Sequence, residues 1–143
     1  MKTDKKAARE AGKEACNALS CPCGGMAYAA CCEPYHLGVF PMTAEQLMRS
    51  RYSAFALGKW EYVHRSWHAS TRPDLASLQQ DVVGKWLGLE VRNHKPDGDQ
   101  ASVEFVARHK ADGRAQRLHE ISRFVREQGQ WYYVDGSFPD ENK

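Results

Sequence analysis

The chain has 143 residues, of which 42% are hydrophobic and 27% charged, and its 20 basic residues are nearly balanced by 18 acidic ones. This length suits one domain of ordinary size with a small addition, and the mixed composition excludes a mainly disordered chain. The net charge of +2 makes nucleic acid an unlikely partner, since binding driven by phosphate neutralisation requires a concentrated basic face.

Residues 1–20 are predicted to be a flexible tail, because their lysine, glutamate and alanine residues leave a helix without an apolar face. Cys16 in this tail is expected to be an unpaired thiol. The tail has no apolar core typical of a signal peptide, and the chain has no run of about 18 apolar residues that a membrane helix requires. We therefore expect a cytoplasmic protein with no membrane partner, whose cysteines stay reduced.

Four of the five cysteines lie within twelve residues, as two close pairs separated by a short glycine-containing loop. Such pairs can supply Zn²⁺ with four tetrahedrally arranged thiolates. A site closed by four protein ligands leaves no position for water, so the zinc is predicted to be structural rather than catalytic. The predicted ligands are Cys21, Cys23, Cys31 and Cys32.

Residues 21–41 are predicted to form this zinc knuckle and a linker, in which Pro34, Gly38 and Pro41 keep the chain extended or turning. The segment has no evident core of its own, so metal binding would supply its folding free energy. His36 is a reserve ligand, in case the geometry forbids one of the two adjacent cysteines.

Residues 42–138 are predicted to form an α+β domain that begins with three helices. Thr43 and Gln46 form a capping box, and an apolar stripe continues the first helix until Gly58 ends it. Apolar residues at helical spacing predict two shorter helices, within residues 60–67 and 75–82.

The apolar period then changes to two, which predicts four strands beginning near residues 87, 101, 118 and 131. Turn sequences at 96–98, 112–113 and 128–129 join them into an antiparallel meander. Three helices on a curved four-stranded sheet form a cone, and such a cone often encloses a pocket. Residues 139–143 are expected to be a second short tail.

Several short blocks are spread over residues 20–138: CPCG at 21–24, CC at 31–32, LMRSRYSAF at 47–55, WH at 67–68, ST at 70–71, WLGL at 86–89, HE at 119–120, SRF at 122–124 and WYYVDG at 131–136. Together they are similar to the YchJ family. The cysteine cluster resembles the SEC-C motif, the zinc-binding tail of the bacterial preprotein translocase ATPase, which contacts the ribosome and an export chaperone. The body resembles the nuclear-transport-factor-2-like, or cystatin-like, cone. The resemblance thus implies the fold and the metal, and it implies no established reaction.

The interior of the predicted cone is expected to be lined by Arg51, Tyr52, Trp67 and Tyr133. An alternative for Arg51 is that it pairs with a carboxylate such as Glu120 and closes the seam between the first helix and the sheet. This alternative is favoured over a place in the pocket.

Four residues are candidates for acid–base catalysis. His119 and Glu120 are neighbours on a strand, so only one of them can face the pocket. His68 at the end of the second helix and Asp135 on the last strand complete the set. Structural roles, such as a helix-end histidine or an ion pair, are favoured over catalysis for these residues.

The sequence therefore predicts a zinc-binding protein that acts as a protein-interaction or binding module, with an unknown protein or a ribosome-associated assembly as its partner. The alternative is a metal-independent pocket enzyme of the hydratase, isomerase or hydrolase type. A small molecule in the cone and a homodimer formed through the outer sheet face are also expected options.

Overall fold

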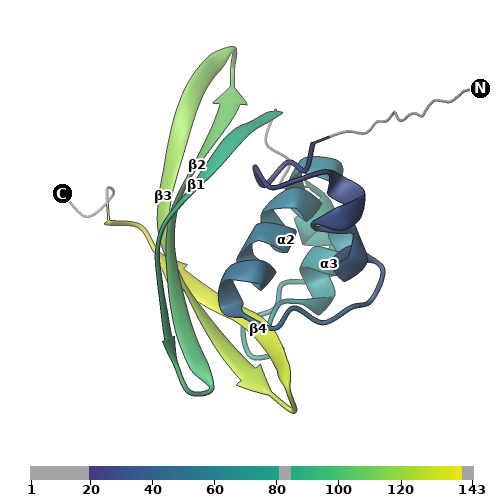
Figure 1. The fold of residues 1–143 in the computed structure, drawn as a ribbon. Helices are drawn as coiled ribbons and strands as arrows, with labels where there is room; N and C mark the ends of the chain where they lie inside the picture. The colour runs from purple at the N-terminus through teal and green to yellow at the C-terminus, as the bar shows by residue number, and fades with distance from the viewer. Residues whose placement is uncertain (1–19, 81–84, 140–143) are drawn as a thin grey trace, which may run out of the picture.

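The computed structural model describes residues 20–80 and 85–139, so Cys16, Val82 and most of both predicted tails lie outside the described residues. A short 3₁₀ helix at Tyr28–Ala30 comes first. It is followed by four helices and then four strands (Figure 1): α1 (Glu33–His36), α2 (Ala44–Leu57), α3 (Trp60–Arg65), α4 (Leu75–Gln80), β1 (Lys85–Asp97), β2 (Gln100–Ala111), β3 (Arg114–Glu127) and β4 (Gln130–Ser137).

The four strands form one antiparallel sheet in the order β1-β2-β3-β4. The sheet curves, and the helices all lie on its concave side, with α2 facing it (Figure 1). Hairpin turns join the strands; at one of them Asp112 and Gly113 have φ angles of 54° and 77°, as a two-residue turn with two left-handed positions requires. The predicted cone with helices on a curved four-stranded sheet is confirmed.

Helix α2 begins and ends where its sequence signals predict. The Thr43 hydroxyl accepts a hydrogen bond from the Gln46 backbone N–H at 3.1 Å, and the Gln46 side chain accepts one from the Thr43 N–H at 3.3 Å. The helix ends at Gly58, whose φ of 74° is left-handed and therefore suits glycine. Both caps satisfy backbone groups that the helix itself leaves without partners.

The main core lies between α2 and the concave face of the sheet. From the helix come Leu47, Met48 and Tyr52, and the sheet contributes Val103, Phe105, Ala107, Phe124 and Trp131. A smaller core joins the end of α2 to α3 and α4 through Ala54, Tyr62, Val63 and Leu78. No helix of the described residues has both the length and the apolar character needed to cross a membrane.

The knuckle segment differs from its prediction in two respects. Part of the predicted extended linker is the helix α1, because a proline in the first turn of a helix loses no hydrogen bond there. The segment also shares the core of the body, since Cys21, Cys23 and Cys32 are buried in the main cluster with Leu47 and Met48. The knuckle therefore packs directly on α2.

Replacing Thr43 with alanine should lower the free energy of unfolding by about 1 kcal/mol, because the Gln46 N–H loses its acceptor. Urea denaturation would measure the change. Thr43→Ser keeps the hydroxyl and should stay close to the wild-type value, whereas equal losses in both variants would contradict a role for the cap.

Candidate functional site

The four predicted cysteine ligands come together at one point of the structure. Their sulfur atoms all lie within 4.8 Å of one another, and Cys21, Cys23 and Cys32 are buried while Cys31 is half-buried. All four are free thiols. Four soft sulfur donors in a compact group can hold a metal ion, and such a set favours zinc or iron.

The spacing of the sulfur atoms fits tetrahedral coordination. Metal–sulfur bonds of about 2.3 Å give a tetrahedron whose edges are about 3.8 Å. The sulfur of Cys23 lies 3.6 Å from that of Cys31 and 3.7 Å from that of Cys32, and the sulfurs of Cys31 and Cys32 are 4.0 Å apart. The adjacent cysteines can thus both serve as ligands of one ion.

Local backbone geometry places these sulfurs. A tight loop closes between the first pair and the 3₁₀ helix, where the Cys21 N–H donates to the Met26 carbonyl and the Gly24 N–H to the Cys21 carbonyl, both at 3.0 Å. Cys31 follows the 3₁₀ helix and Cys32 is the N-cap residue of α1. Gly25 lies against the sulfurs, because a Cβ atom there would be 2.7 Å from Cys31 Sγ and 3.5 Å from Cys23 Sγ.

The crowded thiols do not lose their protons equally. A hydrogen bond from Cys32 lowers the pKa of Cys23 to about 4, whereas burial raises the pKa of Cys31 to about 12. The bond to Cys23 also raises the pKa of Cys32. A divalent cation bound by all four sulfurs would replace their protons.

The cysteine cluster packs on helix α2. The Ser53 hydroxyl is 3.3 Å from the sulfurs of both Cys21 and Cys32, and Arg49 donates to the Cys23 carbonyl at 3.1 Å. Ser53 is fully buried. These contacts fix the cluster on one face of α2.

His36, the reserve ligand, is not part of the sulfur cluster. Its Nε2 is 2.8 Å from the carbonyl oxygen of Ser50, and its Nδ1 is 2.6 Å from the Tyr28 hydroxyl. A carbonyl only accepts, so Nε2 carries the proton and Nδ1 accepts from the tyrosine. Burial lowers the pKa of His36, in keeping with a neutral ring that joins α1 to α2.

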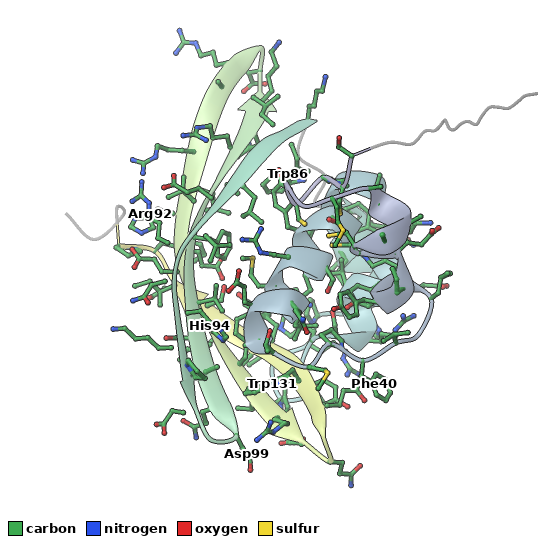
Figure 2. The ribbon with its side chains drawn as sticks, viewed as in Figure 1. Phe40, Trp86, Arg92, His94, Asp99 and Trp131 are labelled. Carbon is green, nitrogen blue, oxygen red and sulfur yellow. The ribbon has the colours of Figure 1, made fainter. Side chains whose placement is uncertain are left out.

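Another face of α2 forms one wall of a cavity of about 280 Å³ between the helices and the sheet. Figure 2 shows side chains of both layers meeting in this space, with Trp86 among them and Arg92 pointing away from the helices. All four predicted pocket residues line the cavity. The full lining is Met48, Arg51, Tyr52, Phe55, Trp60, Trp67, Trp86, Phe105, Ala107, Leu118, Glu120, Ser122, Phe124 and Tyr133.

Arg51 is 6% exposed and contacts both the helical layer and β4. Its Nη1 donates to the Val63 carbonyl at 3.0 Å and to the Ser66 hydroxyl at 2.7 Å, and its guanidinium stacks 4.4 Å above the Tyr133 ring. Nε and Nη2 have no hydrogen-bond partner among the described residues. Burial lowers the pKa of Arg51 to about 10, which still leaves it charged at neutral pH.

Glu120 is 8% exposed and lies at the sheet side of the same cavity. Its Oε2 accepts hydrogen bonds from the Ser122 hydroxyl at 2.6 Å and from the Tyr133 hydroxyl at 3.0 Å. Gly136 leaves room for it, since a Cβ there would be 2.7 Å from the Glu120 Cδ. Burial, followed by the nearby Glu120 charge, raises the pKa of Tyr133.

The favoured pairing of Arg51 with Glu120 is wrong. Within the described parts of the chain, no ion pair joins them, because Arg51 bonds to α3 and the residue after it while Glu120 bonds to hydroxyls of β3 and β4. Tyr133 lies between the two charges instead, with its ring under Arg51 and its hydroxyl on Glu120.

The structure does not bring the other three catalytic candidates into the cavity. His119 lies 2.7 Å from Glu104 on the neighbouring strand, and His68 lies 2.9 Å from Glu127. Asp135 forms a bidentate ion pair with Arg123, at 2.6 and 2.7 Å, and this pair lowers the pKa of Asp135. Of the four candidates, Glu120 alone lines the cavity.

Asp135 faces away because the pairing of β3 with β4 is irregular. Arg123 pairs with Asp135 but the next residue, Phe124, pairs with Tyr133, so the register shifts at this point. Tyr133 and Asp135 are two residues apart and would share a face in a regular strand, whereas such an irregularity places them on opposite faces.

Comparison with known proteins agrees with this architecture. The family model described as YchJ, middle NTF2-like domain, matches residues 43–136. A UPF0225 protein of Ralstonia nicotianae is 54% identical, with 82% of this chain and 90% of the relative covered. The chain belongs to the YchJ family.

Two solved structures are similar to this YchJ-family chain. One is the solution structure of a SEC-C motif containing protein from Rhodopseudomonas palustris, 31% identical, with a TM-score of 0.76 and coverage of 84% of this chain and 98% of that one. The other is the crystal structure of a sec-c motif containing protein from Psychrobacter arcticus, 33% identical, with a TM-score of 0.72 and coverage of 82% and 81%.

Sequence reasoning missed two residues of these sites. Ser53 lies four residues after Arg49, so both reach the same side of α2, but a single serine within a helix gives no sign that it contacts sulfur. Gly136 lies inside β4 beside the Glu120 side chain, and a glycine inside a strand could have indicated the close approach of another group.

Gly25→Ala should weaken metal binding at the four cysteines roughly 10- to 100-fold, as changes to groups supporting metal ligands typically do. The added methyl group would occupy space beside the sulfurs of Cys31 and Cys23. Titration with Co²⁺, followed by its thiolate charge-transfer absorption, would measure the affinity. Gly88→Ala is the matched control, because its added Cβ would meet no atom within 4 Å. Equal affinity in both variants would contradict the close fit at Gly25.

Proposed function

We propose that this protein binds a small, largely apolar molecule in the cavity between α2 and the sheet, and that a structural zinc ion on the four cysteines stabilises the helical wall of that cavity. The observation that carries the proposal is the pair of buried, opposite charges, Arg51 and Glu120, that line one apolar cavity without bonding to each other.

The energetics of the two charges support a ligand site. Taking a charged group out of water costs several kcal/mol unless hydrogen bonds and an opposite charge offset the loss. Arg51 uses one nitrogen of its guanidinium and Glu120 uses one oxygen of its carboxylate. A largely apolar cavity with a few convergent polar groups is the usual form of a small-molecule site.

The size of the cavity supports a ligand larger than benzene. An engineered apolar cavity of about 150 Å³ holds one benzene molecule, and this cavity is about 280 Å³. Aromatic side chains from both layers, including Phe55, Trp60, Trp67 and Trp86, surround it. A flat molecule of two fused rings is therefore a suitable probe.

The four-cysteine site suits a structural zinc ion better than a catalytic one. Four protein sulfurs complete a tetrahedron, so no position is left for water or substrate. When bound, the ion would supply structure, by joining the loop at Cys21 and Cys23 and the N-terminus of α1 to the face of α2 that carries Ser53. The SEC-C motif named for the two similar structures supports the same metal site.

A protein or ribosome-associated partner stays a prediction. Four large apolar side chains in the connection between α1 and α2 are 56–82% exposed: Leu37, Val39, Phe40 and Met42. Exposed apolar residues are common on soluble proteins, so we base the proposed function on the cavity instead.

An acid–base enzyme would have to work with Glu120 as its only cavity-lining member of the four candidates.

The purified protein should contain one zinc ion per chain by elemental analysis. Cys23→Ser should lose it, because Cys23 lies at the centre of the sulfur contacts. His36→Ala is the control and should retain the ion, since both ring nitrogens bind other groups. A metal-free native protein, or zinc loss in the histidine variant alone, would contradict the four-sulfur site.

The cavity should bind 1-naphthol, a neutral two-ring probe. In proton–nitrogen correlation spectra, the indole signals of Trp60, Trp67 and Trp86 should shift, because all three line the cavity. The fourth tryptophan, Trp131, lies outside the lining and its indole N–H donates to the Met42 carbonyl at 3.2 Å, so its signal should stay in place.

A blocking variant gives the matched control for this experiment. Ala107→Leu should abolish the shifts by filling the cavity, and Ala111→Leu, the same change further along β2 and outside the lining, should preserve them. Unchanged indole signals in the wild-type protein, or equal binding to both variants, would overturn cavity binding.

A further inference from the structure

We infer that the cavity selects ligands whose apolar body carries a neutral carboxamide head group, with the amide carbonyl on Arg51 and the amide N–H on Glu120. This inference rests on the proposed function, since it names the chemistry of the molecule that would occupy the cavity. Three polar residues of the lining, Arg51, Glu120 and Tyr133, would contact that head group.

Tyr133 holds the two charges in a fixed relation. Its ring lies 4.4 Å beneath the Arg51 guanidinium, and its hydroxyl donates to Glu120 Oε2 at 3.0 Å. The Ser122 hydroxyl donates to the same oxygen at 2.6 Å. Both hydroxyls thus occupy one carboxylate oxygen, and Oε1 has no partner among the described residues.

Arg51 presents a complementary set of donors. Nη1 is occupied by the Val63 carbonyl and the Ser66 hydroxyl, which leaves the Nε and Nη2 donors without partners in the described structure. More than nine-tenths of each of the two side chains is buried, and both line the cavity. The cavity therefore offers unused donors on one side of Tyr133 and an unused acceptor on the other.

Charge determines which head group fits both sides. A carboxylate would attract Arg51 but repel Glu120, and an ammonium group would do the reverse, because like charges in a desolvated site are costly. An ether can only accept a hydrogen bond, from Arg51, and an alcohol offers a single oxygen to both Arg51 and Glu120. A carboxamide carries an acceptor oxygen and a donor nitrogen on one carbon and has no charge, so it can pair with both groups while their opposite charges balance each other.

The test is a set of ligands with one apolar body and three head groups: 1-naphthylacetamide, 1-naphthylacetate and 1-naphthylmethylamine. Affinities come from the shifts of the Trp60, Trp67 and Trp86 indole signals at pH 7, with Trp131 as the internal reference. The amide should bind about tenfold more tightly than either charged ligand.

Glu120→Gln removes the negative charge and keeps a side chain of the same size. In this variant the acetate should gain about tenfold in affinity relative to the amide, because Arg51 then faces the anion without an opposing charge. Glu104→Gln is the matched control. It lies on β2 and pairs with His119 outside the cavity lining, so it should leave the order of the three ligands unchanged.

Each outcome separates this inference from the proposed function. Preference for the amide, with the change of order in Glu120→Gln alone, supports it. Equal binding of the three ligands, or tighter binding of a charged one to the wild-type protein, overturns the head-group inference while cavity binding stands. Absence of indole shifts with these ligands and with 1-naphthol overturns both.

Discussion

Helix α2 is the element on which both sites depend, because its two faces are buried against different structures. Met48, Arg51, Tyr52 and Phe55 follow the helical spacing of three, four and seven residues and face the cavity. Ser53, with Arg49 four residues before it, contacts the cysteine cluster on another side. A displacement of this helix would therefore change the cavity wall and the floor of the sulfur cluster together.

The buried charge of Arg51 is tolerable only because several elements meet around it. Val63 and Ser66, in and directly after α3, accept two of its hydrogen bonds, and carbonyls near the C-terminus of a helix carry partial negative charge that favours a cation. The Tyr133 ring on β4 contributes a cation–π contact. The guanidinium thus joins α2, α3 and the sheet, and Arg51 lines the cavity with Nε and Nη2 unpartnered among the described residues.

Local signals in the sequence were sufficient for α2, for the four strands and for the grouping of the four cysteines, but not for α1. The Thr43 capping box, the left-handed Gly58 and the alternation of apolar residues each depend on neighbours within a few positions, and so does the close spacing of the cysteine pairs. The partners of Arg51 and the burial of the knuckle depend on contacts between segments that are distant in the sequence. The spacing of apolar residues within one segment does not predict such contacts. The alternation of a strand shows that His119 and Glu120 face opposite ways, but not which of them faces the cavity. The register shift between Arg123 and Phe124 turns Asp135 away from the cavity that Tyr133 lines, although a regular strand would place both on one face.

Sharing one helix has a thermodynamic consequence for the two proposed sites. A metal ion that binds only the docked arrangement of the knuckle stabilises α2 in its folded position, and a ligand in the cavity stabilises the same position from the other side. Any coupling between them is reciprocal, so an ion that tightens ligand binding is itself held more tightly when the ligand is present. A zinc site with no place for substrate can in this way contribute to ligand binding without touching the ligand, because Ser53 and Tyr52 are adjacent residues of one helix that face the sulfurs and the cavity respectively.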